Sequence, residues 1–192
     1  GAGWLPTYAL ALLLAPTFFL GVSPAVLTPG LLWLALLTNA AAAVLLAFHI
    51  ARLWPRERTL VGRFSLAALS LTVLVAFALL VPGVWAQSAS GALRIFYLHL
   101  LLLGWVSTQL LATLLAAGLA PARWLRGSIA ALWLTGVAVM IAALFAVGAP
   151  GLLPVAPLTW LYTAAWASVP VAIAALLLLA ATLFPGWRAR NY

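Results

Sequence analysis

Few side chains in this chain can do chemistry, and the most informative group falls between Arg94 and Gln109. This stretch contains His99, one of two histidines, and Ser107 lies with Gln109 in the same long apolar run. Ionisable and amide groups are costly to bury in a bilayer, so their presence there calls for a reason. The His99 imidazole could bind a metal or a haem iron. Arg94 lies just over one helical turn away, where it could pair with a carboxylate, a haem propionate or a lipid phosphate.

The second histidine, His49, lies near Arg52 at the end of another apolar run. Two histidines in a helical bundle suggest axial ligation of haem or a metal, but at 1.5 Å per residue the two depths differ by roughly 15 Å. Two nitrogens on one iron must be about 4 Å apart, given metal–imidazole bonds near 2 Å. One haem shared by His49 and His99 is therefore not expected, and either histidine could serve a separate centre or pair with another subunit. The alternative is structural: His99 bonds a helix or a carbonyl while Arg94 extends to headgroups, and His49 makes an interfacial hydrogen bond.

The remaining composition excludes most familiar enzyme sites. Glu57 is the single side-chain carboxylate and the chain has no cysteine, so this chain alone cannot assemble a pair of catalytic acids, a Ser/His/Asp triad or a thiolate metal site. The net charge of +8 comes from nine arginines at the ends of apolar runs. Such charges orient a chain against membrane lipid, and no nucleic-acid partner is expected. We do not expect the isolated chain to be an enzyme.

The elements that must position these residues follow from hydropathy. The chain is 68% hydrophobic and 5% charged, and apolar runs of about 20 residues recur along it, each long enough to cross a bilayer. This pattern predicts one all-α integral membrane domain with no long linker. Its six transmembrane helices are expected at about residues 4–21, 31–54, 60–85, 92–119, 124–147 and 158–184, with Pro16 and Pro170 as kinks.

Arginine placement predicts the orientation of these helices. Six spans put the arginines of the second and fourth connections and of the C-terminal tail on one side, and leave Arg94 alone on the other. The positive-inside rule then places both termini in the cytoplasm of a multi-pass protein of the bacterial inner membrane. Trp105, Trp133 and Trp166 lie deep in their runs and are expected to pack helix against helix.

A short motif adds a resemblance to known membrane proteins. The run Tyr97-Leu-His99-Leu-Leu-Leu-Leu-Gly104-Trp105-Val106-Ser107 resembles a pattern in small membrane proteins related to the haem–copper oxidase catalytic subunit, and NnrS-type proteins are similar. In such families a helix carries His, an apolar run and Gly-Trp/Phe-Val. The resemblance implies haem or metal binding, which transfers to His99. Full catalytic subunits need several more metal-binding histidines, so independent reduction of oxygen or nitric oxide is not expected.

These observations predict a membrane subunit or accessory protein of a respiratory or redox assembly. It would bind one haem or metal near the outer face through His99, with Arg94, Ser107 and Gln109 nearby. Membrane lipid and other membrane subunits are the expected partners. Two alternatives stay open: a cofactor-free structural or assembly subunit, and a small-solute channel or transporter that uses the polar residues of the second and fourth spans.

Overall fold

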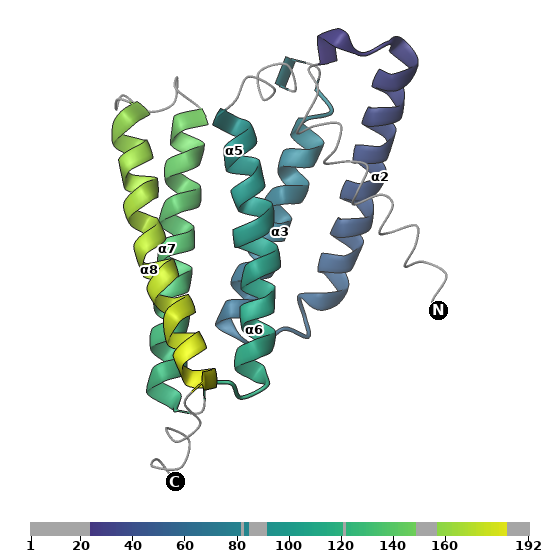
Figure 1. Cartoon of the computed structure of the whole chain (residues 1–192). Helices are drawn as coiled ribbons and strands as arrows, with labels where there is room; N and C mark the ends of the chain where they lie inside the picture. The colour runs from purple at the N-terminus through teal and green to yellow at the C-terminus, as the bar shows by residue number, and fades with distance from the viewer. Residues whose placement is uncertain (1–23, 82, 85–91, 121, 149–156, 184–192) are drawn as a thin grey trace.

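The computed structural model of the chain describes residues 24–81, 83–84, 92–120, 122–148 and 157–183. Within these ranges the chain is helical and has no strand, and its long helices run side by side (Figure 1). The short 3₁₀ turn η1 (Pro24–Val26) leads into the first long helix. The long elements are α2 (Pro29–Leu53), α3 (Leu60–Ala78), a continuous rod of α5 (Ala92–His99), η2 (Leu100–Ser107) and α6 (Thr108–Ala116), α7 (Arg123–Gly148) and α8 (Pro157–Leu183).

Five helices in the described ranges are long and apolar enough to cross a membrane. They are α2, α3, the α5–η2–α6 rod, α7 and α8, and they coincide with the second to sixth predicted spans. The prediction of a multi-pass all-α membrane protein is therefore confirmed at this level. The first predicted span, residues 4–21, lies outside the described residues, so the count of six helices and the side on which the termini lie stay predictions.

The third span is shorter than the predicted range of 60–85, because α3 ends at Ala78. Its last turn tightens: the Leu80 amide donates to Phe77 O and the Val81 amide donates to Ala78 O, each at 3.1 Å. A proline follows at position 82, and the residue before a proline is disfavoured in helical conformation. Hydropathy continues past this point, so it overestimated the length of the helix.

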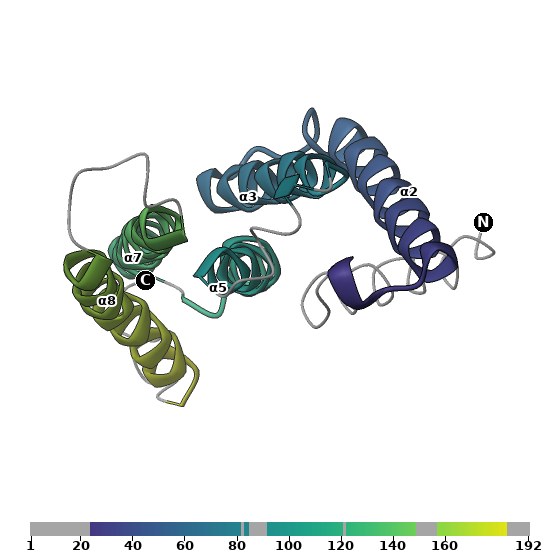
Figure 2. The same cartoon turned by 90° about the horizontal axis from the view of Figure 1, so that it is seen from above.

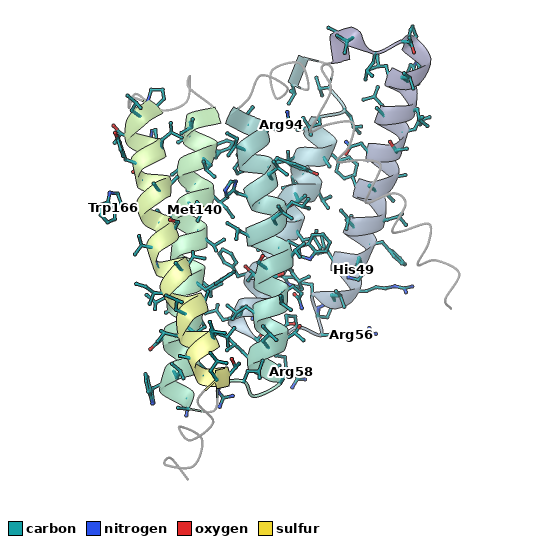
Figure 3. The ribbon with its side chains drawn as sticks, in the orientation of Figure 1. His49, Arg56, Arg58, Arg94, Met140 and Trp166 are labelled. Atoms are coloured by element: carbon teal, nitrogen blue, oxygen red, sulfur yellow. The ribbon has the colours of Figure 1, made fainter. Side chains whose placement is uncertain are left out.

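The described arginines separate between the two ends of the molecule. Figure 3 shows Arg56 and Arg58 with His49 at one end, and Arg94 at the other. Arg123 begins α7 at the same end as Arg56, because α6 and α7 are joined there (Figure 1). This is the distribution that the sequence predicted for these residues. The two tail arginines, Arg188 and Arg190, lie outside the described residues.

Small residues decide which helices pack closely. Seen from above, the rod lies between α7 and α3, α8 packs beside α7, and α2 packs beside α3 (Figure 2). A Cβ atom on Gly136 of α7 would lie 2.7 Å from Ala167 O of α8, so the missing side chain lets these two backbones approach. Ala164 and Ala167 are the buried residues of this part of α8.

The same packing corrects the prediction for one tryptophan. Trp166 is 74% exposed, whereas it was expected to pack between helices. α8 turns its alanines toward α7, which leaves Trp166 pointing away from the other helices (Figure 3). Trp105 and Trp133 are partly buried against neighbouring helices, as predicted.

Candidate functional site

The stretch after His99 is a π-helix, η2, and not the uninterrupted α-helix that hydropathy predicts for residues 92–119. In a π-helix each amide bonds the carbonyl five residues back, a rare arrangement that is frequent at functional sites. Two fully buried hydroxyls bond carbonyls of this segment. Thr108 Oγ1 donates to Leu103 O at 2.6 Å, and Ser65 Oγ of α3 donates to Trp105 O at 3.1 Å.

The π-helix is also anchored to α7. Trp133 Nε1 donates a hydrogen bond to Thr108 Oγ1 at 2.9 Å, so the Thr108 hydroxyl is both donor and acceptor. Gly104 packs at the same level, and a Cβ atom there would lie 3.0 Å from Ala68 Cβ and from Ile141 Cδ1. The absence of a side chain at Gly104 therefore lets η2 sit tightly between α3 and α7.

His99 ends α5 immediately before the π-helix, and its ring orientation is defined by one contact. Nδ1 lies 2.8 Å from Ile95 O. A carbonyl can only accept, so Nδ1 carries the proton and Nε2 keeps its lone pair. Ile95 is 46% and Leu102 is 52% exposed on either side, which places the half-buried ring on the face of the rod that the described helices leave open.

The other predicted site residues are spread along the rod. Arg94 is exposed near the start of α5, just over one turn before His99. Ser107 and Gln109 are half-buried, and within the described residues neither side chain makes a hydrogen bond. They follow His99 by eight and ten residues, which is about two helical turns along the rod. Arg94 is therefore on the same helix as His99 but five residues away, a spacing that does not put two side chains on one face, and Ser107 and Gln109 are out of bonding reach of the imidazole.

His49 lies near the opposite end of the molecule from Arg94 (Figure 3). Within the described residues no cluster of three His, Cys, Asp or Glu side chains could hold a metal ion. His99 contributes one imidazole as a donor. Such a donor fits one axial position of a haem, because a ligating histidine characteristically donates its other ring N–H to a carbonyl or carboxylate, as Nδ1 does here.

The structure also has a cleft of about 110 Å³ between α2, α3 and the rod, which the sequence did not predict. Asn39, Thr72, Tyr97 and Trp105 contribute to its wall. Asn39 is 2% exposed and its Nδ2 donates to Ala76 O of α3 at 2.6 Å, so this amide joins α2 to α3. Tyr97 and Trp105 belong to the same sequence motif as His99. In the structure they line the cleft toward α2 and His99 does not, a difference that sequence spacing alone does not show.

Comparison with protein-family models, with curated proteins and with solved structures found no match to this chain.

Proposed function

We propose that the chain is an integral membrane subunit or accessory protein of a respiratory or redox assembly in the bacterial inner membrane, with both termini in the cytoplasm. In this proposal His99 binds one haem near the outer face as an axial ligand. The observation that carries it is the His99 contact: Nδ1 lies 2.8 Å from Ile95 O, and Nε2 takes no part in that contact.

The surroundings of His99 support a large, flat ligand held at the open face of the rod. Ile95 and Leu102 are exposed apolar residues along that face, and they would contact the apolar surface of a porphyrin. Arg94 is exposed just over one turn before His99, near the start of α5, where its guanidinium would pair with a propionate. A haem would supply a one-electron redox centre, and this chain's part would be to hold and orient it.

A single protein ligand leaves the other axial position of the iron to another chain or to a small molecule. That requirement would be met by a neighbouring subunit of a larger assembly. Arg94 then sets the depth of the centre, since its charge favours the headgroup region.

The test is an optical spectrum of the purified chain, taken as isolated and after titration with hemin. We expect a Soret band that His99→Ala abolishes and that the matched variant His49→Ala retains. Circular dichroism of both variants reports whether the helices are intact. A chain that shows no Soret band under either condition would overturn the haem proposal, and so would a band that survives in His99→Ala.

A cofactor-free structural or assembly subunit is the second candidate, and a specific observation favours it. α8 buries a small part of its apolar surface, and Leu158, Tyr162, Trp166, Ile173 and Leu176 are all exposed along it. This face is available to another membrane subunit. The structural role predicts that loss of the chain destabilises a larger complex while His99→Ala leaves that complex intact, which co-purification of partner subunits from both strains would measure.

A further inference from the structure

The cleft between α2, α3 and the rod lies at the depth of the bilayer centre. Asn39 follows Pro29, the first residue of α2, by ten residues, which is about 15 Å at 1.5 Å per residue. The hydrocarbon core is about 30 Å thick, so Asn39 lies near its middle. Any molecule that reaches this cleft must therefore be soluble in lipid.

The buried amide of Asn39 has a fixed orientation. Nδ2 donates to Ala76 O at 2.6 Å, and because a carbonyl cannot donate, the nitrogen and the oxygen of the amide cannot be exchanged. No described residue donates a hydrogen bond to Asn39 Oδ1, and that oxygen is not sealed by protein atoms. Asn39 lines the cleft, and Oδ1 is the acceptor of its amide.

Tyr97 contributes a second polar group to the same cleft from the rod. Its side chain is half-buried in the wall, and its hydroxyl makes no hydrogen bond to a described residue. The Thr72 hydroxyl donates to Ala68 O of its own helix at 2.9 Å, so it can offer the cleft only an acceptor. The cleft thus pairs one amide acceptor with one phenol that can donate or accept, inside walls of alanine, leucine and Trp105.

We propose that this cleft binds the hydroxyl-bearing ring of a lipid-soluble molecule of the phenol or quinol class. The ligand hydroxyl donates to Asn39 Oδ1 and accepts from the Tyr97 hydroxyl. A cleft of about 110 Å³ is near the size that accommodates a single ring, since an engineered cavity of about 150 Å³ binds benzene. Trp105 offers an aromatic surface for the ring, and a hydrocarbon tail remains in the lipid. This site is independent of His99.

The experiment uses the full chain in phosphatidylcholine nanodiscs and measures uptake of radiolabelled 4-hexylphenol by equilibrium dialysis, with protein-free nanodiscs as the baseline. The matched probe is 4-hexylanisole, which has nearly the same shape and lacks the O–H donor. We expect saturable excess binding of the phenol and at least tenfold weaker binding of the anisole, because a site with a buried acceptor discriminates against a ligand that cannot pair with it.

Variants then assign the binding to the cleft. Tyr97→Phe and Asn39→Leu should each weaken phenol binding at least tenfold, and His99→Ala should leave it unchanged. The control is Thr38→Val, since the Thr38 hydroxyl bonds Leu34 O and Ala35 O within its own helix and Thr38 does not line the cleft. Asn39→Leu also removes a link between helices, so Tyr97→Phe decides the result if that variant fails to fold.

Two outcomes would overturn the proposal. Uptake that rises linearly, as in protein-free nanodiscs, would mean that lipid chains, water or the chain itself fills the cleft. Equal binding of the phenol and the anisole, or full binding by Tyr97→Phe, would mean that the two polar groups do not recognise the ligand. His99 does not line the cleft. A negative result for phenol binding therefore does not contradict the haem proposal, and a negative result for haem binding does not contradict this one.

Discussion

Glu57, the single side-chain carboxylate of the chain, caps the start of α3 together with Thr59. Glu57 Oε1 accepts from the Thr59 amide at 2.8 Å and from Thr59 Oγ1 at 2.6 Å, and Thr59 Oγ1 accepts from the Gly62 amide at 3.0 Å. A Cβ atom on Gly62 would overlap the Glu57 carboxyl group. The glycine therefore leaves room for an acid over the first turn of the helix, where negative charge is stabilised.

These contacts give folding a defined dependence on pH. The hydrogen bonds from the side chain and amide of Thr59, with a smaller contribution from the charge of Arg63, lower the pKa of Glu57 below its ordinary value of 4.5. A group whose folded-state pKa is depressed stabilises the fold above its unfolded pKa, and this contribution is lost as the pH falls through the folded-state pKa. We expect the free energy of unfolding to decrease as the pH falls below about 4.5.

No other side chain titrates as a carboxylate in this acidic range, so the variant Glu57→Gln isolates the effect. We expect it to flatten the acid limb of the stability curve, measured as the unfolding midpoint in mixed micelles against pH. Its stability near neutral pH should also fall, because a neutral amide pairs less strongly with the helix start. An acid limb as steep in Glu57→Gln as in the unchanged chain would contradict this account.

At the scale of the element, the π-helix η2 depends on contacts that α3 and α7 supply. Thr108→Val keeps the shape of the side chain but removes the bond to Leu103 O and leaves Trp133 Nε1 without its acceptor. We expect a loss of about 1–2 kcal/mol in the free energy of unfolding, because a buried donor without a partner is costly. The double variant Thr108→Val with Trp133→Phe should recover part of that loss, since both partners are then apolar.

A matched control lies in the same rod. Thr113 is exposed, and its hydroxyl donates to Gln109 O one turn back. Thr113→Val should therefore change the unfolding free energy by less than about 0.5 kcal/mol. If Thr108→Val lowers the free energy of unfolding no more than Thr113→Val does, the buried hydroxyl does not stabilise the π-helix.

Hydropathy predicted the existence of the described helices well, and their internal geometry poorly. The apolar runs and their Pro and Gly boundaries locate α7 and α8 within a residue or two of Arg123–Gly148 and Pro157–Leu183. Hydropathy did not predict the π-helix, because it is held by tertiary contacts from Ser65 and Trp133. Both residues are far away in sequence. For the same reason the sequence could mark His99 as unusual but could not show which ring nitrogen is free.

At the scale of the whole molecule, the arrangement of helices explains why the polar residues divide into separate places. His99 faces the open side of the rod, whereas Tyr97, two residues earlier, lines the cleft toward α2. The sequence predicted Ser107 and Gln109 near His99, but their positions along the rod separate them from the imidazole. A helix can present two chemically distinct faces to two neighbouring helices. The sequence pattern shows the faces, but it does not show which helix packs against each of them.

The orientation of the molecule in the membrane is the last prediction. The chain has no cysteine, so one introduced cysteine is a unique target for a membrane-impermeant maleimide. Arg58 and Arg94 lie at opposite ends of the structure (Figure 3). The positive-inside rule predicts that Arg94→Cys is labelled in intact spheroplasts and that Arg58→Cys is labelled after permeabilisation alone. Removing Arg94 strengthens the charge asymmetry, so this variant should not invert the protein.

A third variant, Ala2→Cys, tests the first predicted span, which lies outside the described residues. If residues 4–21 cross the membrane, position 2 lies on the same side as Arg58 and is protected in intact spheroplasts. If they do not cross, the start of α2 fixes position 2 on the side of Arg94, because α2 and α5 both begin at that end (Figure 1). Labelling of Ala2→Cys in intact spheroplasts would therefore contradict the prediction of six transmembrane spans and would agree with five. Labelling of Arg58→Cys and Arg94→Cys from one side would contradict the helical arrangement itself.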